Sequence, residues 1–214
     1  MIPKNFHWVW LGKNPLPPQF KSYILTWIYY NPGFKCFIWN EKNLFALRNQ
    51  TLYEKAESYS ERSDIIRYEA LHRYGGIYLD TDFECYAPMD EFLNQEVLLS
   101  FEQPGGHVAT AIIGAEPQHS LMEQCISRMS EWYEINSHTK DPSITSGPAW
   151  LSHCWQQTNL PIITDTMLFF PYLWHQHPYR DPRSVAAHHW TLSWKNDPPV
   201  EPISPLKRKS CKML

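Results

Sequence analysis

The sequence has no stretch of about 18 consecutive apolar residues, the length that a helix needs to cross a bilayer. It also lacks a basic segment followed by an apolar one at its start, which would be typical of a secretory signal. The chain instead passes within its first few residues into a strand-like segment. We therefore expect a cytoplasmic protein that is soluble, or at most peripheral at the inner face of a membrane.

An excess of basic residues is absent as well. The formal net charge is −3, from 19 Lys and Arg against 22 Asp and Glu. Because binding to a phosphate backbone needs a basic face, this balance argues against nucleic acid as a partner. The cysteines are scattered and odd in number, which indicates reduced thiols rather than disulfides or a metal site. They are Cys36, Cys85, Cys125, Cys154 and Cys211.

Aromatic residues, in contrast, are abundant, with 10 Trp, 12 Tyr and 10 Phe in 214 residues. Such side chains fill cores, and they also stack on nucleobases and sugar rings. We find no internal repeat and no linker, and we expect one domain over residues 1–197. Residues 198–214 are proline-rich and then basic, which predicts a poorly ordered tail. Its basic residues are a candidate for peripheral contact with anionic lipid.

Hydrophobic periodicity and turn residues predict an α/β domain, because strand, helix and strand alternate from the start of the chain. A helix that Gly75 and Gly76 end is followed at once by a short apolar strand. The expected strands are 6–11, 34–39, 77–79 and 108–115. The expected helices are 20–28, 60–74, 120–135 and 150–155.

Asp80 and Asp82 stand at the end of the short strand 77–79. Residues two apart in an extended segment project to the same side, so both carboxylates can face one site. Open α/β sheets bind ligands at the carboxyl ends of their strands. Two neighbouring carboxylates repel each other unless a cation lies beside them, and their oxygens favour Mg²⁺ or Mn²⁺. An Asx-rich turn with solvated carboxylates is the alternative.

Upstream, Asp64 and Arg67 share one face of the expected helix 60–74 because they are three residues apart. They are either a surface ion pair or ligand-binding groups, with Arg67 on a phosphate or sugar hydroxyl. A phosphohydrolase of the strand-Asp-x-Asp type is a rival interpretation, but it needs a downstream lysine and a second acidic cluster. The nearest lysine after Asp82 is Lys140, and no such cluster follows it.

Three ordered blocks carry a resemblance to a known family. They are Ile2-Pro3-Lys4 with His7, Trp10 and Gly12; Ser63-Asp64 with Arg67; and Tyr74-Gly75-Gly76-Ile77-Tyr78-Leu79-Asp80-Thr81-Asp82. In these the chain resembles glycosyltransferase family 32, the DXD-containing sugar transferases. That family includes Och-type and capsular polysaccharide enzymes and is related to the glucosylating large toxins.

The resemblance implies a GT-A fold, with a single Rossmann-like, open, twisted and mostly parallel sheet flanked by helices. It also implies a retaining transferase that moves a hexose or N-acetylhexosamine from a UDP- or GDP-linked donor, assisted by Mn²⁺ or Mg²⁺. The acceptor would be a glycan or a lipid-linked saccharide. The alternatives are an effector-type transferase that modifies a protein and a non-catalytic carbohydrate-binding module.

Carried over by position, the resemblance also assigns roles to donor-binding residues. Trp10 would stack on the nucleobase, Asp64 and Arg67 would hold the donor sugar, and Asp80 would bind ribose and sugar hydroxyls. Asp82 would ligate the metal.

Later in the chain, Thr110 stands where the family often has Asn, on the strand that contacts the donor sugar. His188 or His189 would approach the metal or the diphosphate. Ser193 and Trp194 would close over the diphosphate.

Overall fold

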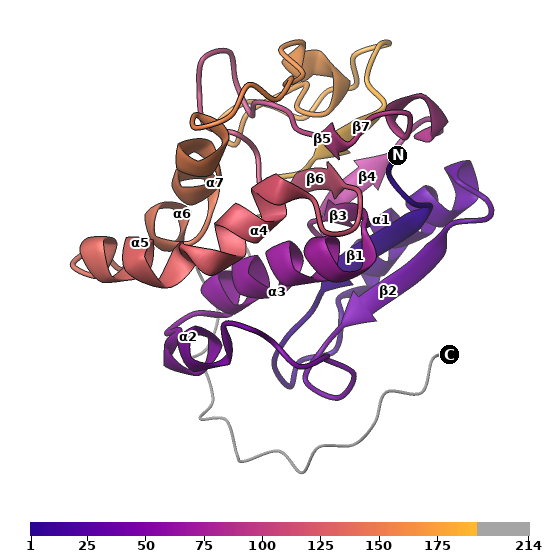
Figure 1. Ribbon diagram of the computed structural model, residues 1–214. Helices are drawn as coiled ribbons and strands as arrows, with labels where there is room; N and C mark the ends of the chain where they lie inside the picture. The colour runs from indigo at the N-terminus through magenta and orange to yellow at the C-terminus, as the bar shows by residue number, and fades with distance from the viewer. Residues whose placement is uncertain (192–214) are drawn as a thin grey trace.

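The strand that leads into Asp80 is the middle strand of the main sheet (Figure 1). The structure is a computed structural model that describes residues 1–191. Its five-stranded sheet has the order β2-β1-β3-β6-β5. The strands are β1 (Asn5–Val9), β2 (Lys35–Trp39), β3 (Gly76–Leu79), β5 (Val97–Leu98) and β6 (Ile112–Ala115). β1 is parallel to β2 and β3, while β6 runs antiparallel to β3 and β5. The expected mostly parallel sheet is therefore confirmed, with β6 as the reversed strand.

Helices cover both faces of this sheet because its strands are apolar on both sides. Trp8, Ile77 and Ile112 point into the core that contains α1, whereas their neighbours Tyr78 and Ile113 point into the core beneath α3, α4 and α7. The helices are α1 (Pro18–Tyr30), α2 (Gln50–Lys55), α3 (Tyr59–Tyr74), α4 (Ser120–Ser127), α5 (Met129–Asn136), α6 (Pro142–Thr145) and α7 (Pro148–Trp155). Two 3₁₀ turns are η1 (Asp90–Phe92) and η2 (Thr166–Leu168).

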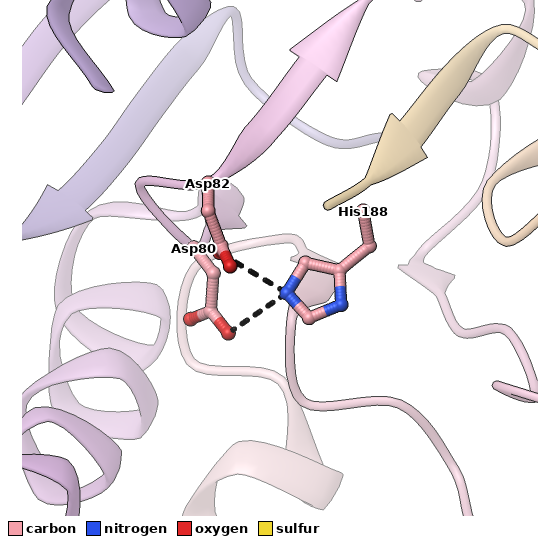
Figure 2. A group of neighbouring side chains, drawn as sticks. All are labelled: Asp80, Asp82 and His188. Carbon is pink, nitrogen blue, oxygen red and sulfur yellow. Dashed lines mark hydrogen bonds and ion pairs between the residues drawn. The ribbon is translucent and has the colours of Figure 1, made fainter. Parts of the chain in front are cut away.

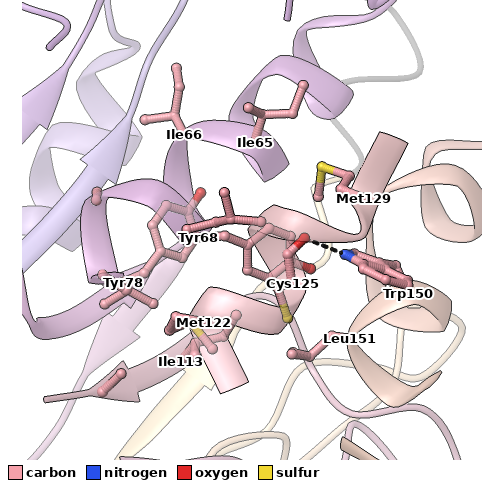
Figure 3. Packing of buried hydrophobic residues seen from close by; sticks show 14 of the residues in the cluster. Ile65, Ile66, Tyr68, Tyr78, Ile113, Met122, Cys125, Met129, Trp150 and Leu151 are labelled. Atoms are coloured by element: carbon pink, nitrogen blue, oxygen red, sulfur yellow. Dashed lines mark hydrogen bonds between the residues drawn. The ribbon is translucent and has the colours of Figure 1, made fainter. Parts of the chain in front are cut away.

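The core on the α3 side joins segments that are distant in sequence (Figure 3). The Trp150 indole of α7 donates a hydrogen bond of 3.1 Å to the Cys125 carbonyl of α4. The fold also brings the Cys125 thiol against that of Cys154, a proximity that their sequence spacing did not indicate. Both cysteines are fully buried and unbridged.

Helix α3 has well-defined ends, and its C-terminal end leads directly into β3. Ser58 and Glu61 form a reciprocal capping box at its start. At its end Gly75 and Gly76 have φ of +59° and +115°, a region that side chains rarely adopt. A Cβ on Gly76 would lie 2.5 Å from the Asn5 carbonyl oxygen of β1. Two glycines therefore allow the helix to turn directly into the central strand.

Two expected elements differ in extent from the prediction. The helix expected over 120–135 is two helices, because Arg128 leaves helical geometry with φ −107° and ψ −1°. The strand expected over 108–115 is regular only at β6. Before it, Thr110 and Ala111 direct their carbonyls to the Arg67 side chain and to the Asp80 N–H. The Ala111 bond continues the β3–β6 register by one position, whereas the Thr110 carbonyl serves a side chain of α3.

A second, two-stranded ribbon was not predicted. It pairs β4 (Phe83–Cys85) antiparallel with β7 (Ala186–His188), two segments about 100 residues apart in the chain. The ribbon begins where the Asp80–Asp82 turn ends. In residues 1–191, no helix combines the length and apolar character needed to span a bilayer.

Candidate active site

Asp80 and Asp82 flank a tight turn between β3 and β4. The Asp80 N–H donates to the Ala111 carbonyl at 2.9 Å, and the Phe83 N–H donates back to the Asp80 carbonyl at 3.2 Å. Because Phe83 pairs with His188 in the ribbon, the turn lies next to the end of β7. The motif from the middle of the chain and the histidines near its end therefore meet at one place.

His188 completes a group of three potential metal ligands with the two aspartates (Figure 2). Its Nε2 lies 3.1 Å from Asp82 Oδ1 and 3.8 Å from Asp80 Oδ2. One ligand atom from each residue lies within 4.8 Å of the others. Among residues 1–191, this is the one group of at least three such side chains with that spacing. The predicted pairing of the carboxylates in one site is thus what the structure shows.

Thr191 holds the second oxygen of the Asp82 carboxylate. Its N–H and its hydroxyl donate to Asp82 Oδ2 at 2.9 and 2.8 Å. Burial raises the pKa of Asp82, but His188 and the Thr191 donors outweigh burial and bring this pKa well below its ordinary value. Asp82 is therefore an ionised carboxylate in a fixed orientation. The sequence analysis missed Thr191, which no pattern marked.

His188 packs against aromatic rings as well as facing the aspartates. Its ring stacks on Phe83, with centroids 5.3 Å apart, and meets the edge of Trp190 at 4.4 Å. Burial lowers its pKa, but Asp82, Asp80 and Glu102 exert the larger combined effect and raise it. The three carboxyls therefore favour the protonated form of the His188 ring.

Arg67, on α3, binds several groups of the site. Its guanidinium donates to the Thr110 carbonyl at 2.7 Å and reaches Asp64 and Asp80 at 3.1 and 3.2 Å. It also lies over the Tyr78 ring, 4.3 Å from the ring centroid. The sequence placed Arg67 and Asp64 on one helix face, and that geometry is observed. Arg67 is buried, and two of its three nitrogens bind within the protein.

Asp64 is buried beside Arg67 and is tied to the α6–α7 junction. The Ser146 hydroxyl donates to its Oδ2 at 2.6 Å. Burial raises the pKa of Asp64 to about 6, against the opposing effects of Arg67 and Ser146. The turn at residues 146–148 begins α7 and also orients Asp64 through Ser146.

Tyr78 is a further residue that the sequence analysis did not single out as functional. It lies two residues before Asp80, and its hydroxyl donates to Asp80 Oδ1 at 2.9 Å. The same hydroxyl accepts from Arg67 and lies 3.2 Å from the Ser63 hydroxyl. Alternation along β3 places Tyr78 on the α3 face, which was the available signal.

Glu102 brings a further carboxyl to the site from the segment between β5 and β6. It interacts electrostatically with His188, Asp80 and Arg67. Burial, opposed by His188 and Arg67, raises its pKa from 4.5 to about 7. No sequence motif marked this residue, because its partners come from three other segments.

The Glu102→Gln variant is expected to gain stability relative to the parent protein as pH rises. The folded parent keeps its Glu102 proton up to about pH 7, whereas the unfolded chain releases it near 4.5. The parent therefore loses stability between these values, by as much as roughly 3 kcal/mol, and the variant lacks this loss. Urea unfolding of both proteins with a chelator, from pH 4 to 8, measures the difference. Parallel stability curves would contradict the raised pKa.

The remaining sequence-predicted residues lie at the edges of the site or beyond the described chain. Trp10 directly follows β1, is partly exposed, and donates from its indole to the Asn14 carbonyl at 2.8 Å. The Thr110 side chain is largely buried, while its carbonyl serves Arg67. Ser193 and Trp194 lie outside the described residues, as does the predicted tail.

The two neighbouring histidines separate in the structure. His189 directs Nε2 to Glu84 at 2.9 Å and Nδ1 to the Tyr172 hydroxyl at 2.7 Å. Its ring has other partners than the aspartates, so His188 is the candidate metal ligand of the pair.

The residues present fit a divalent cation. Asp80, Asp82 and His188 offer two carboxylates and one imidazole nitrogen, a donor set suited to Mn²⁺ and, through the oxygens, to Mg²⁺. Asp82 is ionised and held by Thr191, as an oriented ligand should be. In addition, the cation would relieve the repulsion between the two carboxylates.

Comparison with known proteins gives a consistent picture. The family model described as a glycosyltransferase sugar-binding region containing a DXD motif matches residues 17–99, which include both aspartates. An uncharacterized glycosyltransferase of Acanthamoeba polyphaga mimivirus is 28% identical over 140 residues, covering 60% of this chain and 56% of that protein. Inositol phosphoceramide mannosyltransferase 1 of Schizosaccharomyces pombe is 25% identical over 164 residues, covering 71% and 50%. The chain thus spans about half the length of these relatives.

Solved structures agree on the fold. The PaToxG glycosyltransferase matches with a TM-score of 0.62 at 16% identity, covering 73% of this chain and 69% of that one. This likeness confirms the expected GT-A fold. Over residues 17–99 the chain is therefore similar to glycosyltransferases whose sugar-binding region contains a DXD motif, and Asp80 and Asp82 lie inside that matched region.

Proposed function

We propose that the chain is a retaining, metal-assisted glycosyltransferase that uses a UDP- or GDP-linked hexose or N-acetylhexosamine. The observation that carries this proposal is the meeting of Asp80, Asp82 and His188 above a buried Arg67. Isolated surface carboxylates would not need such partners, which come here from α3, from the segment before β6 and from the end of β7. A carbohydrate-binding module, which needs no such ligand set, accounts for this arrangement less well.

Asp82 and His188, with Asp80, would hold the cation. When bound, a divalent cation stabilises as a Lewis acid the negative charge that grows on the departing diphosphate. Arg67 keeps Asp80 in place and contributes positive charge from below. Trp10, at the end of β1, is the proposed stacking surface for the nucleobase, and Asp64 and Asp80 the proposed partners of donor hydroxyls.

For retention, the leaving phosphate oxygen can accept the proton of the acceptor hydroxyl on the same face of the sugar. The proton then moves to the diphosphate while the new glycosidic bond forms and the old one breaks. No protein base is required in this scheme. Glu102 is a further carboxyl outside the DXD motif that interacts electrostatically with Asp80 and His188.

We propose a lipid-linked saccharide as the acceptor and mannose as the first sugar to test. The support is the similarity to a protein whose name is inositol phosphoceramide mannosyltransferase. A glycan or a protein acceptor would keep the same donor chemistry and would differ only in the last step. These acceptors are outcomes that the experiment can distinguish.

A panel of nucleotide sugars tests the proposal. Each donor is incubated with the chain and Mn²⁺, and release of nucleoside diphosphate is measured with and without a chelator. We expect chelator-sensitive release from one donor, and its acceleration by a lipid-linked saccharide. Failure of every donor, with free glycan bound in the absence of nucleotide, would favour the binding module instead.

A further inference from the structure

His189, which the site does not use as a ligand, lies in a polar and aromatic cluster beside it. We call this group the His189 clamp; it consists of Tyr23, Glu84, Tyr172 and His189. Glu84 Oε2 lies 2.9 Å from His189 Nε2, and the Tyr172 hydroxyl lies 2.7 Å from Nδ1. The Tyr23 ring of α1 stacks on the imidazole, with centroids 4.3 Å apart and planes 16° apart. Both ring nitrogens and one ring face are therefore engaged.

The clamp fixes the tautomer as well as the place of the imidazole. A carboxylate can only accept a hydrogen bond, so Nε2 of His189 carries a hydrogen and donates it in a hydrogen bond to Glu84. The Tyr172 hydroxyl is then left to bond Nδ1. The backbone of Tyr172 is held in turn, because the Trp190 indole donates to the Tyr172 carbonyl at 2.8 Å.

The segment that the clamp fixes is intrinsically weak. β4 and β7 form a two-stranded ribbon with three residue pairs, and such ribbons are marginal by themselves in water. Helix α1 supports the β4 side: the Trp27 indole donates to the Phe83 carbonyl at 2.7 Å, and the Thr26 hydroxyl accepts from the Cys85 N–H at 2.8 Å. On the β7 side, the Val185 N–H just before the strand donates to the Leu168 carbonyl at 2.9 Å, and the clamp holds the residue just after it.

The backbone of His189 is also bonded to the turn that carries the two aspartates. Its N–H donates to the Asp82 carbonyl at 3.0 Å, which continues the ribbon by one bond. His188 precedes it and Thr191 follows two residues later, and both contact the Asp82 carboxylate. Neighbouring side chains of a strand point to opposite sides, so a fixed His189 ring turns His188 toward the aspartates.

We propose that His189 is a positioning residue, held by Tyr23, Glu84 and Tyr172, that sets the geometry of Asp82, His188 and Thr191 for cation binding. This inference rests on the proposed metal-assisted function. It gives His189 a role distinct from that of a metal ligand. Partners that orient ligands in this indirect way typically affect metal affinity by about 10- to 100-fold.

The test uses two variants that change no charge and touch no proposed ligand. Tyr172→Phe removes the hydroxyl from Nδ1 and keeps the ring, and Tyr23→Leu removes the stacking. Tyr179→Phe is the matched control, because the Tyr179 ring lies beside Tyr172, with centroids 6.1 Å apart, while its hydroxyl donates to the Met167 sulfur at 3.4 Å and not to His189. Mn²⁺ binding to each protein is titrated without nucleotide by the electron paramagnetic resonance signal of free Mn²⁺, well below the thermal midpoint.

We expect both clamp variants to bind Mn²⁺ about 10-fold more weakly than the parent, and the control to match the parent within twofold. A purely structural role would lower the thermal midpoint and leave the Mn²⁺ affinity unchanged, which would overturn the proposal. If Tyr172→Phe does not fold, Tyr23→Leu decides. Absence of Mn²⁺ binding by the parent would contradict the metal-assisted function itself, and with it the clamp's role.

Discussion

Asp82→Asn is expected to reduce donor turnover by about 1,000-fold while the protein remains folded. The substitution preserves the shape of the side chain and removes the charge that would hold the cation. Removing one preorganised electrostatic contact to a transition state typically costs 10²- to 10³-fold, and loss of a metal ligand belongs at the upper end. Release of nucleoside diphosphate at saturating Mn²⁺, with circular dichroism as the check on folding, measures the effect.

Asp90→Asn is the matched control for that result. Asp90 is an exposed carboxylate that pairs with Lys4 at 2.7 Å, away from the DXD turn. We expect the turnover of the Asp90→Asn variant to equal that of the parent, because an exposed ion pair contributes little even to stability. Turnover in folded Asp82→Asn equal to that in Asp90→Asn would remove Asp82 from the mechanism.

Arg67→Met is expected to destabilise the protein by about 3–5 kcal/mol and to abolish turnover. Arg67 is buried, and its removal leaves Asp64 and Asp80 without their shared cation. A buried charge deprived of its partner costs about this much, far more than a broken surface pair. The Thr110 carbonyl would lose its donor as well. Urea unfolding gives the change in free energy.

Arg183→Met is the comparison for Arg67. Arg183 also meets two aspartates, Asp165 at 3.1 Å and Asp181 at 3.0 Å, but it is 58% exposed. Solvent screening should keep its effect on the free energy of unfolding far below that of Arg67. Equal losses in the two variants would mean that Arg67 is not the organising charge of the site.

The central strands and the DXD turn were predictable because their signals are local. Alternating or continuous apolar runs mark β1, β2 and β3, and Gly75-Gly76 marks the passage from α3 into β3. The spacing of Asp64 and Arg67 likewise gave their common helix face. Each of these inferences needs only residues that are near in sequence.

The rest of the site depends on contacts between distant segments. The β4–β7 ribbon pairs residues about 100 positions apart, so the sequence left the choice between His188 and His189 open. Thr191 and Glu102 act through side chains or backbone that no pattern connects to Asp80 and Asp82. Arg67 is buried because the segment that contains Thr110 packs over it, and the periodicity of the helix does not reveal that contact.

The location of a bound cation tests the central claim most directly. Crystals of the chain with Mn²⁺ and a nucleoside diphosphate would be measured at a wavelength where manganese scatters anomalously. We predict one strong anomalous peak among Asp80, Asp82 and His188, in contact with the diphosphate. A peak elsewhere, or a bound diphosphate with no manganese beside these three side chains, would contradict it.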